Sequence, residues 1–222
     1  MALEIHDLLI VRDGFRLEIE YLRVERKTVL LGRNGAGKST LLKYLMGFSK
    51  AVRGRTLIDG VNISNLPPEE RPLGYIPQRL IRLPLSPLRQ LEFFSRIHGS
   101  DYRPIVAKLG LQSLIEKRSL SIGETQLLTI ATALLKNPRA LLMDEPCANL
   151  DWPNKRTVLE LVNNIEVPIL YVTHDPFEAL YLADEIALLE DKRLSGVYKN
   201  TAKNKVGEIY EQYDLYQLLK RM

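Results

Sequence analysis

A glycine-rich stretch near the N-terminus has the residue types and the spacing of a phosphate-binding loop. Residues 32–40 read GRNGAGKST and fit the pattern G-x-x-x-x-G-K-[ST]. Glycines let the backbone curl so that several N–H groups point at one anion, and the following helix adds its positive end. In such a loop the lysine reaches the β- and γ-phosphates and the next hydroxyl binds Mg²⁺. The residues that we expect to hold the phosphates are Gly32, Arg33, Asn34, Gly35, Ala36, Gly37, Lys38, Ser39 and Thr40.

The segments on either side of this loop suit it. Residues 28–31 form an apolar run typical of a buried strand, and residues 41–46 have the composition of a helix that ends at Gly47. The alternative interpretation is a chance glycine-rich turn. Because strand, loop and helix follow one another in the required order, the context favours phosphate binding.

A second apolar run carries acidic residues at its end. Residues 140–143 read ALLM and are followed directly by Asp144 and Glu145. A buried parallel strand of this kind delivers its carboxylates to the C-terminal edge of the sheet, where open α/β sheets bind ligands. The alternative for each acid is a solvated strand end, which the preceding loop argues against.

Composition limits the class of protein. The chain has 222 residues, 45% hydrophobic and 26% charged, with a net charge of +4 and a single cysteine, Cys147. One cysteine permits no internal disulfide, so we expect a reducing compartment. The longest apolar stretches fall short of the roughly 18–20 residues that span a bilayer, and no signal peptide is evident. No dense Lys/Arg block with aromatics supports nucleic-acid binding.

The remaining pattern predicts an α/β fold with a mostly parallel sheet, and with the phosphate-binding loop it resembles the P-loop NTPases, which implies a RecA-like core. Residues 3–11 and 15–24 read as strands of a small antiparallel element at the N-terminus. Helical periodicity dominates residues 80–138, which we interpret as a helical subdomain inserted into the sheet. We expect one domain over 1–222, with a core of 1–79 and 139–195 and a helical tail of 196–222.

Several further motifs complete the pattern, and together they resemble one family, the ATP-binding cassette (ABC) ATPases. Residues 120–126, LSIGETQ, resemble its signature segment L-S-G-G-Q-x-Q, and residues 148–151, ANLD, match its D-loop. Gln78 and His174 stand where the family has its Q-loop glutamine and switch histidine. The resemblance covers about residues 1–195.

The resemblance implies a role for each strand-end residue. Asp144 would hold Mg²⁺ together with Ser39 and Gln78, since Mg²⁺ keeps several waters and takes few protein ligands. Glu145 would accept a proton from the attacking water. His174 would hydrogen-bond the γ-phosphate and position Glu145, so the implied catalytic residues are Gln78, Glu145 and His174.

The signature segment would act across a dimer. In the family it lies over the γ-phosphate bound by the other subunit, so the resemblance assigns nucleotide contacts to Ser121, Gly123, Glu124 and Asp151. Ser121 and Glu124 also fit a capping box, which predicts a helix starting there. Ile122 departs from the family's glycine and would limit how closely a second subunit approaches. For the adenine-stacking aromatic, Phe15 and a plain core aromatic stay equal alternatives.

Two segments resemble a narrower group, the import ATPases for molybdate, tungstate and sulfate. These are residues 66–78, LPPEERPLGYIPQ, and residues 173–194, THDPFEALYLADEIALLEDKRL. The resemblance implies ATP and Mg²⁺ as cofactors and a homodimer on ATP binding. It also implies membrane-spanning permease subunits and a solute-binding protein as partners, with no nucleic acid. We therefore expect a cytoplasmic protein, peripheral on the inner face of the membrane.

Other functions remain to be compared with transport. The main alternative is a non-transport ABC ATPase of DNA repair or translation, but repair types carry long coiled-coil insertions and translation types carry two cassettes. A regulator without turnover is disfavoured because both Glu145 and His174 are present. Residues 80–88 are unusually apolar for a loop, and they either dock a membrane subunit or pack under the helices.

Overall fold

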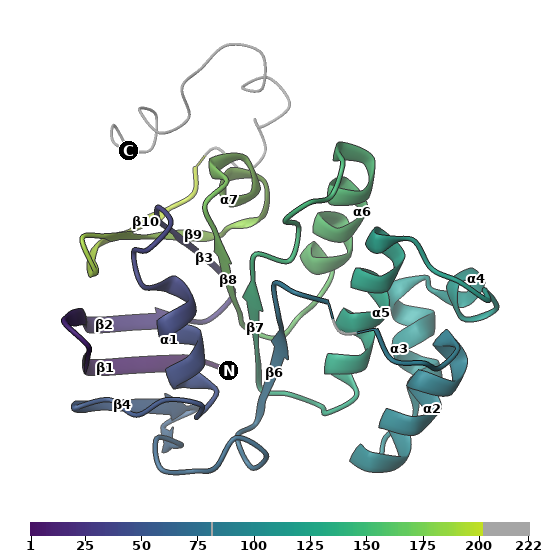
Figure 1. Ribbon diagram of the computed structural model, residues 1–222, viewed down its shortest axis with the longest axis horizontal. Coiled ribbons are helices and arrows are strands. Elements are labelled where there is room, and N and C mark those ends of the chain that lie inside the picture. Colours follow the sequence, from purple (N-terminus) through teal and green to yellow (C-terminus); the bar gives the residue numbers. More distant parts are fainter. Residues whose placement is uncertain (81, 202–222) are drawn as a thin grey trace.

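The computed structural model describes residues 1–80 and 82–201, which form an α/β fold around one ten-stranded sheet (Figure 1). The strand order is β5-β4-β1-β2-β10-β9-β3-β8-β7-β6. The strands are β1 Leu3–Arg12, β2 Phe15–Val24, β3 Lys27–Leu31, β4 Arg53–Ile58, β5 Val61–Asn62, β6 Leu73–Ile76, β7 Ala140–Asp144, β8 Ile169–Thr173, β9 Glu185–Glu190 and β10 Arg193–Lys199. The helices are α1 Lys38–Leu45, α2 Pro87–His98, α3 Tyr102–Leu109, α4 Gln112–Ile115, α5 Ile122–Leu134, α6 Trp152–Asn163 and α7 Pro176–Leu182.

The sheet has a parallel half and an antiparallel half. Strands β9, β3, β8, β7 and β6 pair in parallel, whereas β1 pairs antiparallel with both β2 and β4. The expected fold class is confirmed, with a parallel core and an antiparallel element at the N-terminal strands. The antiparallel element is larger than expected because β4 and β5 extend it, whereas β10 pairs in parallel with β2 and antiparallel with β9.

Strand β10 also corrects the expected tail. Residues 196–199 belong to this strand, which pairs antiparallel with β9 through a tight turn, so they are not helical. Asp191 and Lys192 in that turn both have positive φ, as two-residue hairpin turns require. The strand is half-solvated and polar, so its sequence lacks the hydrophobic pattern that would predict a strand. The rest of the tail that we expected to be helical, residues 202–222, lies outside the described residues.

Two apolar clusters cover opposite faces of the sheet. Side chains alternate along β3, so that Val29 and Leu31 join one cluster while Leu30 joins the other. The first cluster packs against α2, α5, α6 and α7, and the second against α1 and the β1–β2 hairpin. Burying each such side chain contributes about 1.5–3 kcal/mol, which holds the strand ends in fixed positions.

The helices α2 to α5 gather at one side of the molecule, away from β1, β2 and β4 (Figure 1). They occupy residues 87–134, and the described part of 80–138 contains no strand. Helix α5 begins with the expected capping box, in which Ser121 and Glu124 bond each other's backbone N–H. Among the described residues, no helix has the length and apolar character needed to cross a membrane.

One buried arginine fixes the far end of α1. Arg71 is 3% exposed and donates to the carbonyl oxygens of Tyr44, Leu45, Leu66 and Ser64. Two of these carbonyls belong to the last turn of α1, and the other two to the loop that leads toward β6. The guanidinium fork thus adds donors to carbonyls at the end of the helix, where the Tyr44 oxygen also accepts from the Gly47 N–H at 2.9 Å.

Candidate active site

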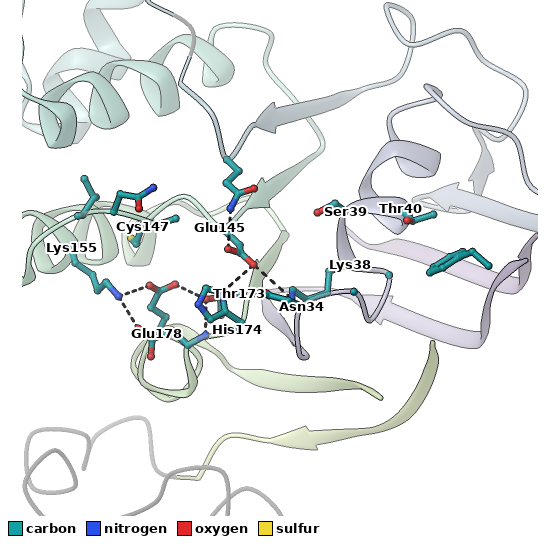
Figure 2. Close-up of a pocket in the computed structure, with 18 residues that line it drawn as sticks. Asn34, Lys38, Ser39, Thr40, Glu145, Cys147, Lys155, Thr173, His174 and Glu178 are labelled. Atoms are coloured by element: carbon teal, nitrogen blue, oxygen red, sulfur yellow. Dashed lines mark hydrogen bonds and ion pairs between the residues drawn. The ribbon is translucent and has the colours of Figure 1, made fainter. Parts of the chain in front are cut away.

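The glycine-rich loop connects β3 to α1 and forms one wall of a cavity of about 750 Å³. We call this the main cavity (Figure 2). Gly37 has φ +110, and a Cβ there would lie 3.1 Å from the side chains of both Leu17 and Phe15. Gly32 packs so closely on β9 that a Cβ would lie 2.6 Å from the Leu189 oxygen. Glycine is therefore required at both positions.

The loop residues divide between two cavities. Six line the main cavity, while Arg33 and Ala36 line a neighbouring one beside the β9–β10 turn and Gly32 is buried beneath. The six are Asn34, Gly35, Gly37, Lys38, Ser39 and Thr40. Lys38 is 5% exposed, and its Nζ donates to the carbonyl oxygens of Gly32 at 2.7 Å and Arg33 at 3.2 Å. The loop's own carbonyls thus hold the ammonium group within the loop.

Asp144 and Ser39 bring two oxygen donors together. The Ser39 hydroxyl donates to Asp144 Oδ1 at 3.2 Å. Burial raises the pKa of Asp144, while the Ser39 hydrogen bond acts in the opposite direction. Tyr75, at the end of β6, is hydrogen-bonded to the same carboxylate, and burial and this neighbour raise the pKa of Tyr75 to about 12. A hydroxyl and a carboxylate oxygen are ligands that suit Mg²⁺.

Glu145 lies at the centre of the main cavity wall. Its φ of +46 is left-handed, a conformation that costs a non-glycine residue of the order of 1–2 kcal/mol. The turn after β7 is held by the Glu145 N–H, which donates to the Val172 oxygen at 2.9 Å. In this backbone conformation the Glu145 side chain lines the main cavity and lies within reach of three other polar groups.

Three groups from separate elements contact the Glu145 carboxylate (Figure 2). His174 Nδ1 lies 3.1 Å and Lys38 Nζ 3.6 Å from Oε1. Gln78 Nε2 donates to Oε2 at 3.2 Å. Both carboxylate oxygens are therefore oriented by donors. The arrangement suits a general base facing a phosphate site, with a water between them.

The signature segment lies elsewhere. Ser121, Gly123, Glu124 and Asp151 do not line the main cavity. Asp151 caps α6 by accepting from the Asn154 N–H at 3.2 Å and from its Nδ2 at 2.6 Å. A Cβ on Gly123 would lie 2.5 Å from Asn154 Oδ1. Asn154 therefore contacts both the signature segment, through Gly123, and the D-loop motif, through Asp151. Ile122 is 53% exposed beside them. Within one chain, these predicted site residues are not brought to the nucleotide loop.

The structure adds residues that the motifs did not indicate. Tyr75 contacts Asp144, and a buried polar cluster beneath His174 contains Lys155, Thr173 and Glu178. Tyr75, Thr173 and Glu178 lie within the two segments that resemble import ATPases, but only their contacts in the folded chain point to a role at the site. Phe15 does line the main cavity, with Lys192 Nζ 5.1 Å from its ring centroid. That position fits an adenine-stacking aromatic as well as a packing role.

Comparison with known proteins places these features in one family. A family model described as "ABC transporter" matches residues 20–148. A molybdate/tungstate import ATP-binding protein of Archaeoglobus fulgidus is 36% identical over 94% of this chain and 93% of its own length. A molybdenum import ATP-binding protein of Haemophilus ducreyi is 39% identical over 75% of this chain. The chain spans about half of that second relative, 52% of its length.

Solved structures agree on the fold. An ATP-binding subunit of an ABC transporter superposes with a TM-score of 0.77 and 25% identity, over 99% of this chain and all of the other. An ATP-binding cassette in its ADP conformation gives a TM-score of 0.80 at 21% identity, over 99% and 98% of the two chains. The second likeness concerns the fold alone.

Proposed function

Since the chain belongs to the ABC transporter ATPase family, we propose that it energises the import of a tetrahedral oxyanion such as molybdate or tungstate. Its own chemistry is ATP binding and hydrolysis. The observation that carries the import proposal is the similarity, over nearly its whole length, to an import ATP-binding protein of that class. The names of its relatives favour transport over the repair and translation alternatives.

The main cavity supplies the parts that ATP hydrolysis needs. The N–H groups of the loop and the start of α1 surround the phosphates, and Lys38 contributes the positive charge at the β- and γ-phosphates. Ser39 and Asp144 would hold Mg²⁺, with Gln78 beside them, because they present oxygen donors at one point. Bound there, Mg²⁺ would neutralise charge that develops on the phosphates.

Glu145 is the proposed general base. Its carboxylate accepts a proton from the water that attacks the γ-phosphate, and its orientation comes from His174, Gln78 and Lys38. His174 is 53% exposed, so it can also reach a phosphate in the cavity while it contacts Glu145. Orienting both oxygens of the base keeps it aligned as the water attacks.

The signature segment acts in a second copy. In one chain Ser121 and Gly123 lie outside the main cavity, so they would contact ATP bound by a partner subunit. Nucleotide bound between two copies favours the dimer, because it contacts both. A homodimer that forms on ATP binding and separates after hydrolysis would convert this chemistry into motion.

Permease subunits dock beside Gln78 in this proposal. A cavity of about 390 Å³ with a largely apolar lining lies between β6, α2 and α5. Met46, Pro77, Leu83 and Phe94 line it, and Leu85 nearby is 39% exposed. An apolar groove of this kind suits a helix of a membrane protein. Docking there would place the chain on the inner membrane face, with a solute-binding protein on the other side.

Reconstitution tests this function directly. The chain would be assembled with its permease and solute-binding subunits in liposomes, and ATP-dependent uptake of labelled molybdate, tungstate and sulfate would be measured. We expect uptake of one oxyanion, and ATP hydrolysis stimulated by the loaded binding protein. Stimulation by DNA or ribosomes, with no uptake, would overturn the proposal. Cysteines at Arg82 and Arg89 should crosslink to the permease if docking is as described.

A further inference from the structure

A buried acidic side chain lies directly beneath the loop that carries His174. Glu178, on α7, is 3% exposed and accepts hydrogen bonds from the Tyr171 hydroxyl at 2.9 Å and the Thr173 hydroxyl at 2.8 Å. Lys155 Nζ, from α6, lies 2.7 Å from its other oxygen. A buried charge of this kind is stable only when fully paired, and here both oxygens have partners.

Lys155 binds a second acid on the same loop. Its Nζ donates to Asp175 Oδ2 at 2.7 Å. Burial works to lower the pKa of Lys155, but the hydrogen bonds to Asp175 and Glu178 outweigh it and raise the pKa above its ordinary value. The lysine thus stays charged and joins two carboxylates (Figure 2 shows Lys155 reaching across to Glu178).

The residues on both sides of His174 are fixed by this cluster. Thr173 donates to Glu178 and also accepts from the Asp175 N–H at 3.0 Å. Asp175 binds Lys155 and caps α7 by accepting from the Phe177 N–H at 2.9 Å. The His174 side chain instead contacts Glu145, with Nδ1 3.1 Å from Oε1. Its backbone position is therefore set by Lys155 and Glu178 rather than by its own imidazole.

The same cluster connects His174 to the start of α6. Lys155 lies in the first turn of that helix, whose N-cap is Asp151 of the D-loop motif. Trp152 makes a second contact between the two helices, with its ring edge-on to Phe177 at a centroid distance of 4.8 Å. A displacement of the α6 N-terminus would pull on the lysine and, through it, on both neighbours of His174.

We propose that Lys155 and Glu178 are positioning residues for ATP hydrolysis, holding His174 against Glu145 and tying that contact to the α6 N-terminus. The proposal rests on the proposed ATPase mechanism but concerns a contact that exists without nucleotide. A displacement of about 1 Å in such an arrangement can cost roughly 100-fold in rate. The alternative is that the cluster only stabilises the packing of α6 on α7.

Histidine NMR tests the contact independently of hydrolysis. The chain has 3 histidines, so His6 and His98 serve as internal references for the ring signals of His174. In Glu178→Gln, which keeps the shape but loses the charge, we expect the His174 signals to shift and the other two to stay. An unchanged His174 would overturn the positioning role, whether or not the protein hydrolyses ATP.

Kinetics then separate positioning from packing. Glu178→Gln should lower kcat by roughly 10–100-fold with an unchanged KM for ATP. Combined with His174→Ala it should cost no more than His174→Ala alone, because both act through one contact. Independent, additive losses, or a raised KM with a lower melting temperature, would overturn the proposal. A wild-type chain without ATPase activity would instead refute the proposed function.

Three further variants keep the test interpretable. Thr173→Val removes one hydroxyl without leaving an unpaired charge, so it should fold even if Glu178→Gln does not, and it should lower kcat in the same way. Lys155→Arg keeps the charge and should retain most of the activity. Lys108→Met breaks the exposed Lys108–Glu166 pair, which joins Nζ and Oε2 at 2.8 Å, and should leave both the NMR signals and kcat unchanged. A Thr173→Val protein with wild-type kcat would count against positioning.

Discussion

The main cavity and the N-terminus of α5 are organised in opposite ways. At the cavity, Glu145 is contacted by residues that are 67, 29 and 107 positions away in the chain, namely Gln78, His174 and Lys38. At α5, Ser121 bonds to Glu124 three positions away, and Lys117 pairs with Glu124 seven positions away. The cavity therefore exists only in the folded chain, whereas the signature conformation is local.

The two regions are therefore suited to act in different places. A constellation assembled by the fold is ready to position water and phosphate within one chain. A locally capped helix start that lies outside the cavity would meet ATP through a second copy, as proposed above. Variants of the cavity should therefore change chemistry, and variants of α5 should change association or local stability.

The largest effect is expected at Glu145. Glu145→Gln keeps the shape of the side chain but cannot accept a proton, so ATP hydrolysis should fall by roughly 10²–10⁴-fold while Mg-ATP still binds. Phosphate release and calorimetry measure the two quantities. Glu166→Gln, an exposed carboxylate outside the cavity, is the matched control. Hydrolysis at the wild-type rate would show that the base is another residue.

Loss of nucleotide affinity is expected next, at Lys38. Lys38→Ala removes the loop cation that lines the main cavity. A charged hydrogen bond is worth about 1.5–3 kcal/mol, so affinity for Mg-ATP should fall roughly 10–100-fold. Isothermal calorimetry checks this. Lys43→Ala, an exposed lysine on the same helix, should bind as wild type does. If both variants bind Mg-ATP with equal affinity, Lys38 does not contribute to phosphate binding.

The third test measures dimer formation and concerns the N-terminus of α5. The Glu145→Gln protein should be dimeric with ATP and monomeric with ADP, because uncleaved ATP contacts both copies. Adding Ser121→Arg should abolish the dimer, since a bulky side chain blocks the approach, but should leave ATP binding intact. Size-exclusion with light scattering distinguishes the states. If the Ser121→Arg protein still dimerises, the signature segment is not at the interface. If Glu145→Gln alone stays monomeric with ATP, exposed Ile122 is the first residue to replace.

The smallest effect is a local one at the helix cap. Ser121→Ala removes the side-chain oxygen that accepts from the Glu124 N–H at 3.2 Å, which should cost about 1 kcal/mol of folding free energy. For a chain of this size that lowers the melting temperature by about 2–4 °C. Ser121→Asp, which can cap equally well, should restore the value. An unchanged melting temperature in Ser121→Ala would show that the cap does not stabilise the fold.

The same contrast explains what could be predicted from the sequence. The loop of residues 32–40, the acids at the end of β7 and the α5 capping box are local patterns with a direct physical meaning. The cluster of Lys155 and Glu178 has no such pattern, because its members approach only when α6 packs on α7. Strand β10 was missed for a related reason. Its sequence is polar, and it forms a strand because it pairs with β9 and β2 in the folded chain.

Arg71 holds the C-terminal end of α1 against the loop that leads to β6. The N-terminus of this helix carries the phosphate loop, and its last turn is clamped by a guanidinium that also grips the loop carbonyls of Ser64 and Leu66. A short helix secured at both ends moves as a rigid rod. We therefore expect a shift of the loop to be passed along α1 to the segment that enters β6, the strand that precedes Gln78. Lysine, with one compact ammonium group, could not hold four carbonyls in this way.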